Sequence, residues 1–124
     1  MKPILLVEDN DDIREAVAEL LRDSGYAVSE AENGLCALDR LREMDEDPCL
    51  LLLDLMMPVM SGVELLHVLH KNQRLGSVPV IVVSAGGSSA DVPEANKFLH
   101  KPVDPEALLR MVDELCRDGA HGKD

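Results

Sequence analysis

The sequence predicts an α/β domain with a doubly wound, five-stranded parallel sheet and helices on both of its faces. Short apolar runs rich in leucine, isoleucine and valine alternate along the chain with longer amphipathic segments of helical period. This alternation is typical of right-handed βαβ units, whose strands lie parallel. Three of the apolar runs lack polar alternation, as expected of strands buried on both faces. In such a domain we expect the strand order 2-1-3-4-5.

The first half of the chain contains two strands, each followed by a helix. The run ILLVE at 4–8 predicts the first strand, and the helix that begins near residue 11 is expected to end at Gly25. A weaker second strand, YAVSEA, occupies 26–31, and Asn33 is suited to cap the helix after it. The apolar stripes that should face the sheet consist of Ile13, Ala16, Val17, Leu20 and Leu21 and of Leu35, Leu38, Leu41 and Met44.

Three further strands follow in the second half. The runs CLLLLDL at 49–55 and VPVIVVS at 78–84 predict the third and fourth strands, and KFLH at 97–100 predicts a short fifth strand. Ser61 and Glu64 form a capping-box pattern at the start of a third helix.

The segment between the fourth and fifth strands is short for a loop and a helix. Only 16 residues separate Ser84 from Lys101, and Pro93 would interrupt a helix begun much earlier. We therefore expect a shortened or irregular fourth helix. The last helix opens with Asp104 as its cap and Pro105 at its first position.

Length and charge limit the functional classes. The 124 residues fit a single domain, for which we expect the range 1–118 and a disordered C-terminal tail at 119–124. The formal net charge of -12 repels nucleic acid and anionic lipid, so we expect neither direct nucleic-acid binding nor membrane binding. Because no signal-peptide pattern or membrane-length apolar run is present, we expect a cytoplasmic location.

The three cysteines, Cys36, Cys49 and Cys116, are odd in number and widely spaced. Their spacing excludes a CxxC motif for metal binding or redox chemistry. We expect three reduced thiols that pack as ordinary apolar residues.

Charged and polar residues follow the ends of four predicted strands: Glu8, Asp9, Asp54, Ser84 and Lys101. In a doubly wound sheet, the carboxyl ends of neighbouring strands border one crevice, where ligands bind. Asp54 is the informative member, because an ionised carboxylate costs several kcal/mol to bury unless it is paired or coordinated. Three carboxylates at one crevice require a cation, and a small set of oxygen ligands favours Mg2+.

These residues suit phosphoryl transfer to a carboxylate. Asp54 would act as a nucleophile toward phosphorus, because Mg2+ and Lys101 neutralise the phosphoryl oxygens as they approach. Lys101 would pair with one phosphoryl oxygen, and Ser84 would donate a hydrogen bond to another. The product would be an aspartyl phosphate. Pro102 follows Lys101, and the sequence leaves both isomers of this peptide bond open.

Four motifs together resemble the receiver domain of two-component response regulators: VEDN at 7–10, LLLDLMMPVMSG at 51–62, VVSA at 82–85 and FLHKP at 98–102. The resemblance covers nearly the whole chain, and it implies that Asp54 is the phosphoacceptor. It further implies that Asp9 binds Mg2+ directly and that Glu8 holds the metal mainly through water. By the same resemblance, the backbone carbonyl of Met56 completes the ligands that the protein supplies.

The resemblance also implies a conformational switch and a class of partner. Ser84 corresponds to the switch hydroxyl of the family, Phe98 to its switch aromatic, and Lys101 to its phosphate-binding lysine. When Ser84 is drawn toward the phosphoryl group, Phe98 is expected to turn into the space that it leaves. The phosphoryl donor would be a phosphohistidine on a sensor histidine kinase or a phosphotransfer protein. The protein would catalyse its own Mg2+-dependent phosphorylation and dephosphorylation, and no turnover of external substrates is expected.

Three other functions would place different demands on the same sequence. A phosphatase of the haloacid dehalogenase type would need an aspartate where Met56 stands. A flavodoxin would need a hydroxyl- and glycine-rich phosphate loop after the first strand, where EDNDD would repel phosphate. A receiver-like interaction module that is never phosphorylated stays open as the alternative.

Overall fold

The computed structural model describes residues 2–55, 57, 59–86 and 92–121, the last five by their backbone only. The strands are β1 (Ile4–Val7), β2 (Val28–Ala31), β3 (Leu50–Asp54), β4 (Val80–Ser84) and β5 (Lys97–His100). The helices are α1 (Asp11–Asp23), α2 (Gly34–Glu43), α3 (Gly62–His70) and α4 (Pro105–His121), with a short 3-10 helix η1 (Leu75–Ser77). Each of the five strands lies within the apolar run that predicted it.

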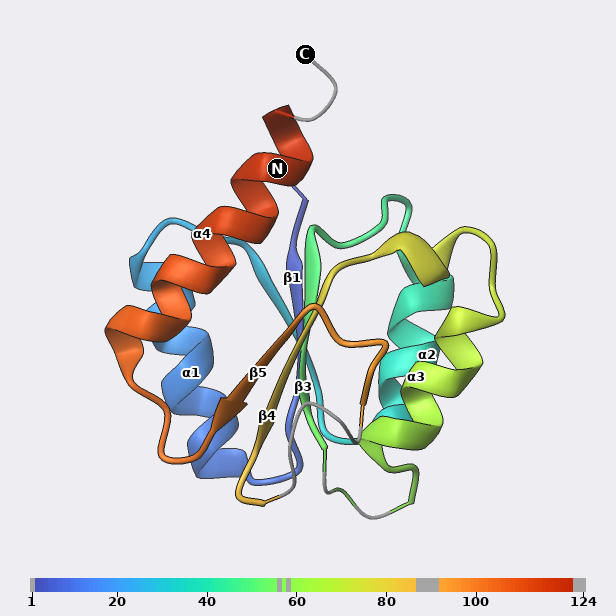
Figure 1. Cartoon of the computed structure of the whole chain (residues 1–124), viewed down its shortest axis with the longest axis horizontal. Coiled ribbons are helices and arrows are strands. Elements are labelled where there is room, and N and C mark those ends of the chain that lie inside the picture. The colour runs from blue at the N-terminus through green and yellow to red at the C-terminus, as the bar shows by residue number, and fades with distance from the viewer. Residues whose placement is uncertain (1, 56, 58, 87–91, 122–124) are drawn as a thin grey trace.

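The strands form one sheet in the order β2-β1-β3-β4-β5, and every neighbouring pair is parallel. Helices α2 and α3 cover one face of this sheet, and α1 and α4 cover the other (Figure 1). The predicted doubly wound architecture and its strand order are therefore confirmed. All carboxyl ends of the strands point toward the same edge, at the bottom of Figure 1.

The sequence signals that begin and end the helices work as predicted. The Asn33 side chain accepts a hydrogen bond from the Cys36 N–H at 2.8 Å. At α3, Ser61 and Glu64 make both hydrogen bonds of the capping box, at 3.2 and 3.1 Å. Gly25 ends the α1 turn with a φ of +97°, a left-handed conformation that glycine adopts without steric cost.

Successive side chains of the central strands point to opposite faces and build two apolar cores. The strand residues packed with α2 and α3 are Leu5, Val7, Leu51, Leu53, Val80 and Val82, and those packed with α1 and α4 are Ile4, Leu6, Leu50, Leu52, Ile81 and Val83. Leu35 was expected in the core but is 49% exposed, because Ala37, Leu38 and Leu41 form the buried face of α2.

The connection between β4 and β5 contains no helix in its described residues, 85–86 and 92–96. Residues 87–91, where much of the shortened or irregular fourth helix was expected, lie outside the described residues. Asn96 fastens the connection to β4, since its side chain accepts a hydrogen bond from the Val80 N–H at 2.8 Å and its own N–H donates to the Val80 carbonyl at 2.8 Å. Val92 is buried in the core under α2 and α3.

Helix α4 begins at Pro105, as predicted, and the Leu108 N–H donates to the Asp104 carbonyl at 3.0 Å. The helix continues to His121, so its backbone is helical at 119–121, where the sequence suggested a disordered tail. Within the described part of the chain, no helix is both long and apolar enough to cross a membrane.

The expectation of three reduced thiols is wrong for two of them. Cys49 and Cys116 form a disulfide across a sequence separation of 67 residues, with their Cα atoms 5.3 Å apart. The fold sets the start of β3 beside α4, a proximity that the linear spacing of the cysteines does not show. Cys36 is free and packs against the core beneath α2 and α3.

Candidate functional site

The residues singled out at the strand ends lie at the carboxyl edge of the sheet. Asp54 is the last residue of β3 and Ser84 the last residue of β4. Glu8 and Asp9 directly follow β1, and Lys101 directly follows β5. Because β1, β3, β4 and β5 are consecutive parallel neighbours, residues far apart in the chain meet at this edge.

Lys101 lies between two buried carboxylates. Its Nζ is 2.9 Å from Oε1 of Glu8 and 3.4 Å from Oδ2 of Asp54. Glu8 and Asp54 are only 4% and 5% exposed, so the Lys101 ammonium offsets negative charge that solvent does not reach. The Lys101 N–H also donates to the Ser84 carbonyl at 2.9 Å, which ties the lysine to β4, and the Lys101–Pro102 peptide bond is cis.

Glu8, Asp9 and Asp54 form a cluster of three carboxylates. One oxygen from each lies within 4.8 Å of the others. At an effective dielectric constant of about 20, the buried charges of Glu8 and Asp54 repel by roughly 3 kcal/mol, and solvent weakens the repulsion of the exposed Asp9. One lysine does not offset three negative charges. The donor set consists of hard oxygen atoms, which fit Mg2+. Met56, whose carbonyl was expected to complete the ligands, lies outside the described residues.

The surroundings shift two ionisable groups of the site. Burial raises the pKa of Glu8, and the hydrogen bond from Lys101 offsets this effect only in part. For Lys101, burial lowers the pKa, but the hydrogen bond to Glu8 and the charges of Asp54 and Glu8 outweigh burial, so the pKa is raised overall. Lys101 is therefore held in its charged form, as a phosphate-binding group requires.

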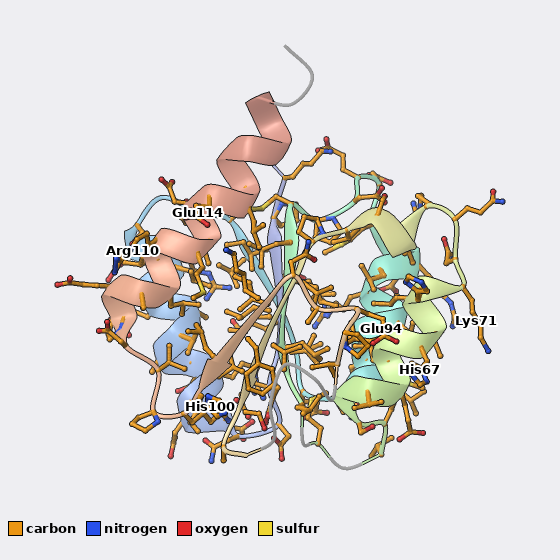
Figure 2. The ribbon with its side chains drawn as sticks, viewed as in Figure 1. His67, Lys71, Glu94, His100, Arg110 and Glu114 are labelled. Carbon is orange, nitrogen blue, oxygen red and sulfur yellow. A yellow bond between two sulfur atoms is a disulfide. The ribbon has the colours of Figure 1, made fainter. Side chains whose placement is uncertain are left out.

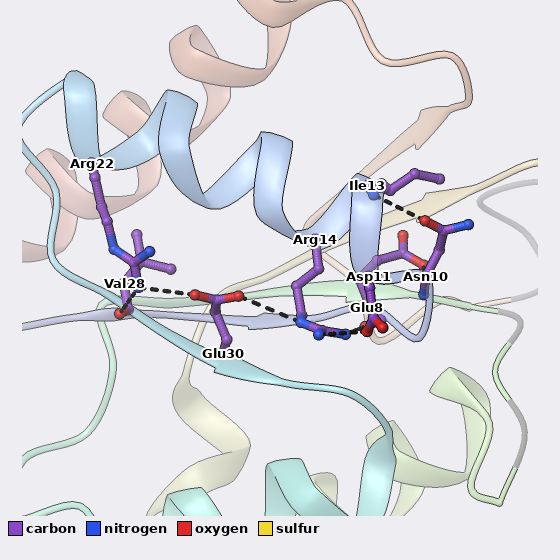
Figure 3. A network of polar contacts seen from close by, with 8 residues as sticks. All are labelled: Glu8, Asn10, Asp11, Ile13, Arg14, Arg22, Val28 and Glu30. Atoms are coloured by element: carbon purple, nitrogen blue, oxygen red, sulfur yellow. Dashed lines mark hydrogen bonds and ion pairs between the residues drawn. The ribbon is translucent and has the colours of Figure 1, made fainter.

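Arg14, which the sequence did not single out, holds the acidic loop in place (Figure 3). Its guanidinium donates to the Glu8 backbone carbonyl at 2.8 Å and pairs with Asp11 at 2.7 Å and with Glu30 of β2 at 3.4 Å. Arg22 also pairs with Glu30, at 3.0 Å. The sequence does show an arginine soon after the acidic run EDNDD, which could have suggested that Arg14 pairs with this run. It does not show that Glu30, on β2, lies close to Arg14.

Ser84 and Phe98 lie on adjacent strands and on the same side of the sheet. Ser84 is fully buried, and its Oγ accepts a hydrogen bond from the Gly86 N–H at 3.3 Å. Phe98 is half-buried against the core under α2 and α3. His100, labelled in Figure 2, is in register with Ser84. Its ring contacts that of Phe98, with the centroids 5.0 Å apart. No role was predicted for His100, and its contact with Phe98 follows from the two-residue spacing along β5.

A cavity of about 490 Å³ opens beside the carboxylates, on the α1 and α4 side of the sheet. Its walls are mostly apolar, and Glu8, Asp54 and Lys101 lie at one end. Ile13 of α1 faces this cavity rather than a packed core, which explains why it is 38% exposed although it belongs to the predicted apolar stripe.

Comparison with known proteins identifies the family. The response regulator receiver domain model matches residues 4–113, and the chain therefore belongs to the receiver domain family of two-component systems. The chain is 37% identical over 117 residues to the probable transcriptional regulator ycf29 of Pyropia yezoensis, a match that covers 90% of this chain and 52% of the relative. The chain spans about half the length of this relative and of other curated regulators that it matches, such as response regulator Rre1 of Synechocystis.

Two solved structures show the same fold. A CheY-like response regulator receiver domain protein from Methanospirillum hungatei superposes with a TM-score of 0.85 at 28% identity, covering 98% of each chain. Response regulator protein TrrA from Thermotoga maritima, solved in complex with Mg(2+)-BeF, gives a TM-score of 0.81 at 30% identity, covering 93% of this chain and 99% of that one. Domains of this family are signalling domains rather than enzymes that turn over external substrates.

Proposed function

We propose that this chain is a phosphorylation-activated switch that accepts a phosphoryl group on Asp54. The observation that carries the proposal is the position of this carboxylate. Asp54 is buried at the carboxyl end of β3, with the Lys101 ammonium 3.4 Å away and the oxygens of Glu8 and Asp9 within 4.8 Å. A buried carboxylate beside a lysine and two further acidic groups suits nucleophilic attack on phosphorus better than it suits structural stability.

In the proposed reaction, a carboxylate oxygen of Asp54 attacks the phosphorus of a phosphohistidine. The new O–P bond forms as the N–P bond breaks, and the electron pair of that bond returns to the imidazole of the donor. Lys101 pairs with one phosphoryl oxygen, and the Ser84 hydroxyl donates a hydrogen bond to another. Phosphoryl transfer depends mainly on such positioning and charge compensation.

Glu8, Asp9 and Asp54 are the residues proposed to hold Mg2+, with the carbonyl of Met56 as a further ligand. When bound, the ion supplies neutralisation of charge on the phosphoryl oxygens. The close approach of three carboxylate oxygens supports this assignment, because it is unfavourable without a cation. The same groups would serve dephosphorylation of Asp54, so the chain acts on itself rather than on an external substrate.

Ser84 and Phe98 are proposed to convert phosphorylation into a change of surface. A hydroxyl drawn toward the phosphoryl group leaves its present site, and the half-buried Phe98 ring turns toward the vacated space. Support comes from their location on adjacent strands and on one side of the sheet. The local event at Asp54 thus biases a two-state element at β5.

The partners follow from the proposed chemistry. The donor is a sensor histidine kinase or a phosphotransfer protein, and an output partner reads the changed surface. The receiver domain is proposed to span 1–118 and to act in the cytoplasm. Neither nucleic acid nor a membrane is a proposed partner of this domain, because the net charge of -12 opposes both.

Intact-mass measurement after incubation with Mg2+ and acetyl phosphate tests the proposal. We expect one phosphoryl adduct on the native chain, its loss on chelation of Mg2+, and none on Asp54→Ala. Asp39→Asn, on the exposed surface of α2, is the matched control and should be phosphorylated like the native chain.

A native chain that gains no adduct from acetyl phosphate or from a range of sensor kinases would refute the proposal. The chain would then be a receiver-like interaction module that works without phosphorylation. An adduct that persists in Asp54→Ala would reject Asp54 as the acceptor.

A further inference from the structure

We propose that Cys49 and Cys116 are a reversible redox site that makes and breaks a covalent tether for helix α4. The two residues are 67 positions apart in the sequence, yet their Cα atoms lie 5.3 Å apart, within the usual range for disulfides of about 4.4–6.8 Å. The proposal is independent of phosphorylation, because it concerns the opposite end of the sheet from Asp54.

The noncovalent attachment of α4 is concentrated in the first part of the helix. Leu108 and Val112 are its fully buried side chains among those described, whereas residues 113–116 are half-buried or exposed. Tyr26 donates a hydrogen bond to Asp113 at 2.9 Å, and Lys97 pairs with the exposed Glu114 at 3.3 Å. A surface ion pair of this kind contributes little, and Leu115 is only partly buried against the core under α1 and α4, so the disulfide is a major constraint on residues 113–116.

The first part of α4 is not tightly packed on every side. The cavity of about 490 Å³ lies between the sheet, α1 and α4, and Leu108 forms part of its wall together with Ile13 and Ala16 of α1. A helix that borders a cavity forgoes part of its packing energy. The covalent link therefore contributes a larger share of the attachment of α4 than it would in a filled core.

Cys49 is held in place by the sheet, whereas Cys116 lies on the later part of helix α4, which can move when the disulfide is open. The Cys49 N–H donates to the Pro3 carbonyl at 2.9 Å, and the next residue, Leu50, is fully buried in β3. Breaking the disulfide would leave β3 in place and release the end of α4. Both cysteines are half-buried rather than fully enclosed, as access by a small thiol requires.

The exchange needs only thiol and disulfide reagents. Two protein thiols and one oxidised glutathione give the protein disulfide and two reduced glutathione molecules, and a dithiol such as dithiothreitol reverses the reaction. Disulfides in a reducing compartment are usually transient, so the reversibility of this one rests on the proposed cytoplasmic location.

The test uses the full chain with Cys36→Ser, so that only the pair reacts. After treatment with oxidised glutathione, unfolding and alkylation with N-ethylmaleimide should label neither remaining cysteine, and after dithiothreitol both should be labelled. Because a loop of this length is closed, the reduced form should unfold at a Tm about 10 °C lower than the oxidised form. Amide exchange at 113–116 should also be faster in the reduced form.

The variant Cys36→Ser with Cys116→Ser is the matched control, and its Tm should not respond to either reagent. Two labelled cysteines after oxidised glutathione would overturn the proposal, as would a disulfide-linked dimer in place of the internal bond. Closure of the bond with no change in Tm or in exchange at 113–116 would also overturn it, because α4 would then need no tether. Phosphorylation of Asp54 is scored separately, so the two proposals fail independently.

Discussion

The two ends of the sheet differ in the side chains that they bury. At the carboxyl end of the strands lie Glu8, Asp54 and Ser84, which are the buried polar side chains among the described residues. At the opposite end, β3 starts with the fully buried Leu50, next to the disulfide of Cys49. The first end gathers like charges and holds two carboxylates, Glu8 and Asp54, away from water. The second end contributes apolar packing and a covalent link. The difference shows that one edge of a parallel sheet can hold clustered polar groups while the opposite edge contributes packing and a covalent link.

The largest effect is expected at the end of the sheet where β3 starts, next to the disulfide. Leu50→Ala removes a fully buried side chain from β3 and should lower the free energy of unfolding by about 3 kcal/mol, measured by urea denaturation of the oxidised protein. Leu35→Ala, at a position 49% exposed, should change it by less than about 0.5 kcal/mol. Equal effects of the two substitutions would contradict the burial of Leu50 in the core under α1 and α4.

The next largest effect is expected at the carboxyl end of the sheet, where Lys101 contacts Glu8 and Asp54. Lys101→Met removes the ammonium 2.9 Å from Glu8 and 3.4 Å from Asp54, and phosphorylation by acetyl phosphate should slow by about 100-fold. Lys97→Met, which removes a lysine from the start of β5, should leave the rate within about twofold, as expected away from the site. An unchanged rate in Lys101→Met would exclude Lys101 from phosphate binding.

A smaller effect is expected for Arg14, which holds the acidic loop at the carboxyl end of the sheet. Arg14→Met removes the hydrogen bond to the Glu8 carbonyl and the ion pairs with Asp11 and Glu30, and should lower the free energy of unfolding by about 1 kcal/mol. The comparison variant is Arg42→Met, whose side chain is 70% exposed and pairs only loosely, at 3.7 Å. Similar losses in both variants would mean that the network around Arg14 does not brace the loop.

The smallest effect separates charge repulsion from packing. Asp9→Asn removes one of the three clustered charges, so in the presence of a chelator the free energy of unfolding should rise, by less than about 1 kcal/mol. Added Mg2+ should then stabilise this variant less than it stabilises the native chain. Destabilisation in the presence of the chelator, or an equal response to Mg2+, would argue against a shared cation site.

The contrast between the two ends also explains what the sequence reveals. Asp54, Ser84 and Lys101 stand beside strand ends in the sequence, and parallel topology alone is enough to bring strand ends together. The strand order and the caps at Asn33 and Ser61 were predictable for a similar reason, because each depends on residues close in the chain.

Features that depend on the relative placement of helices were not predictable. The disulfide of Cys49 and Cys116 requires α4 to cross the sheet near the start of β3. Helical periodicity placed Leu35 and Ile13 on apolar stripes, but it does not say which edge of a stripe a neighbouring element covers. Arg14 was missed because its partner Glu30 belongs to a different strand.

The alternation of side chains along the strands has a consequence for how partners would approach. Asp54 shares its side of β3 with Leu52, which packs under α1 and α4, whereas Ser84 shares its side of β4 with Val82, which packs with Phe98 under α2 and α3. A signal that enters at Asp54 and leaves at Phe98 would cross the thickness of the sheet. Under the proposed function, the phosphoryl group would then arrive on one side of the sheet and the changed surface would form on the other.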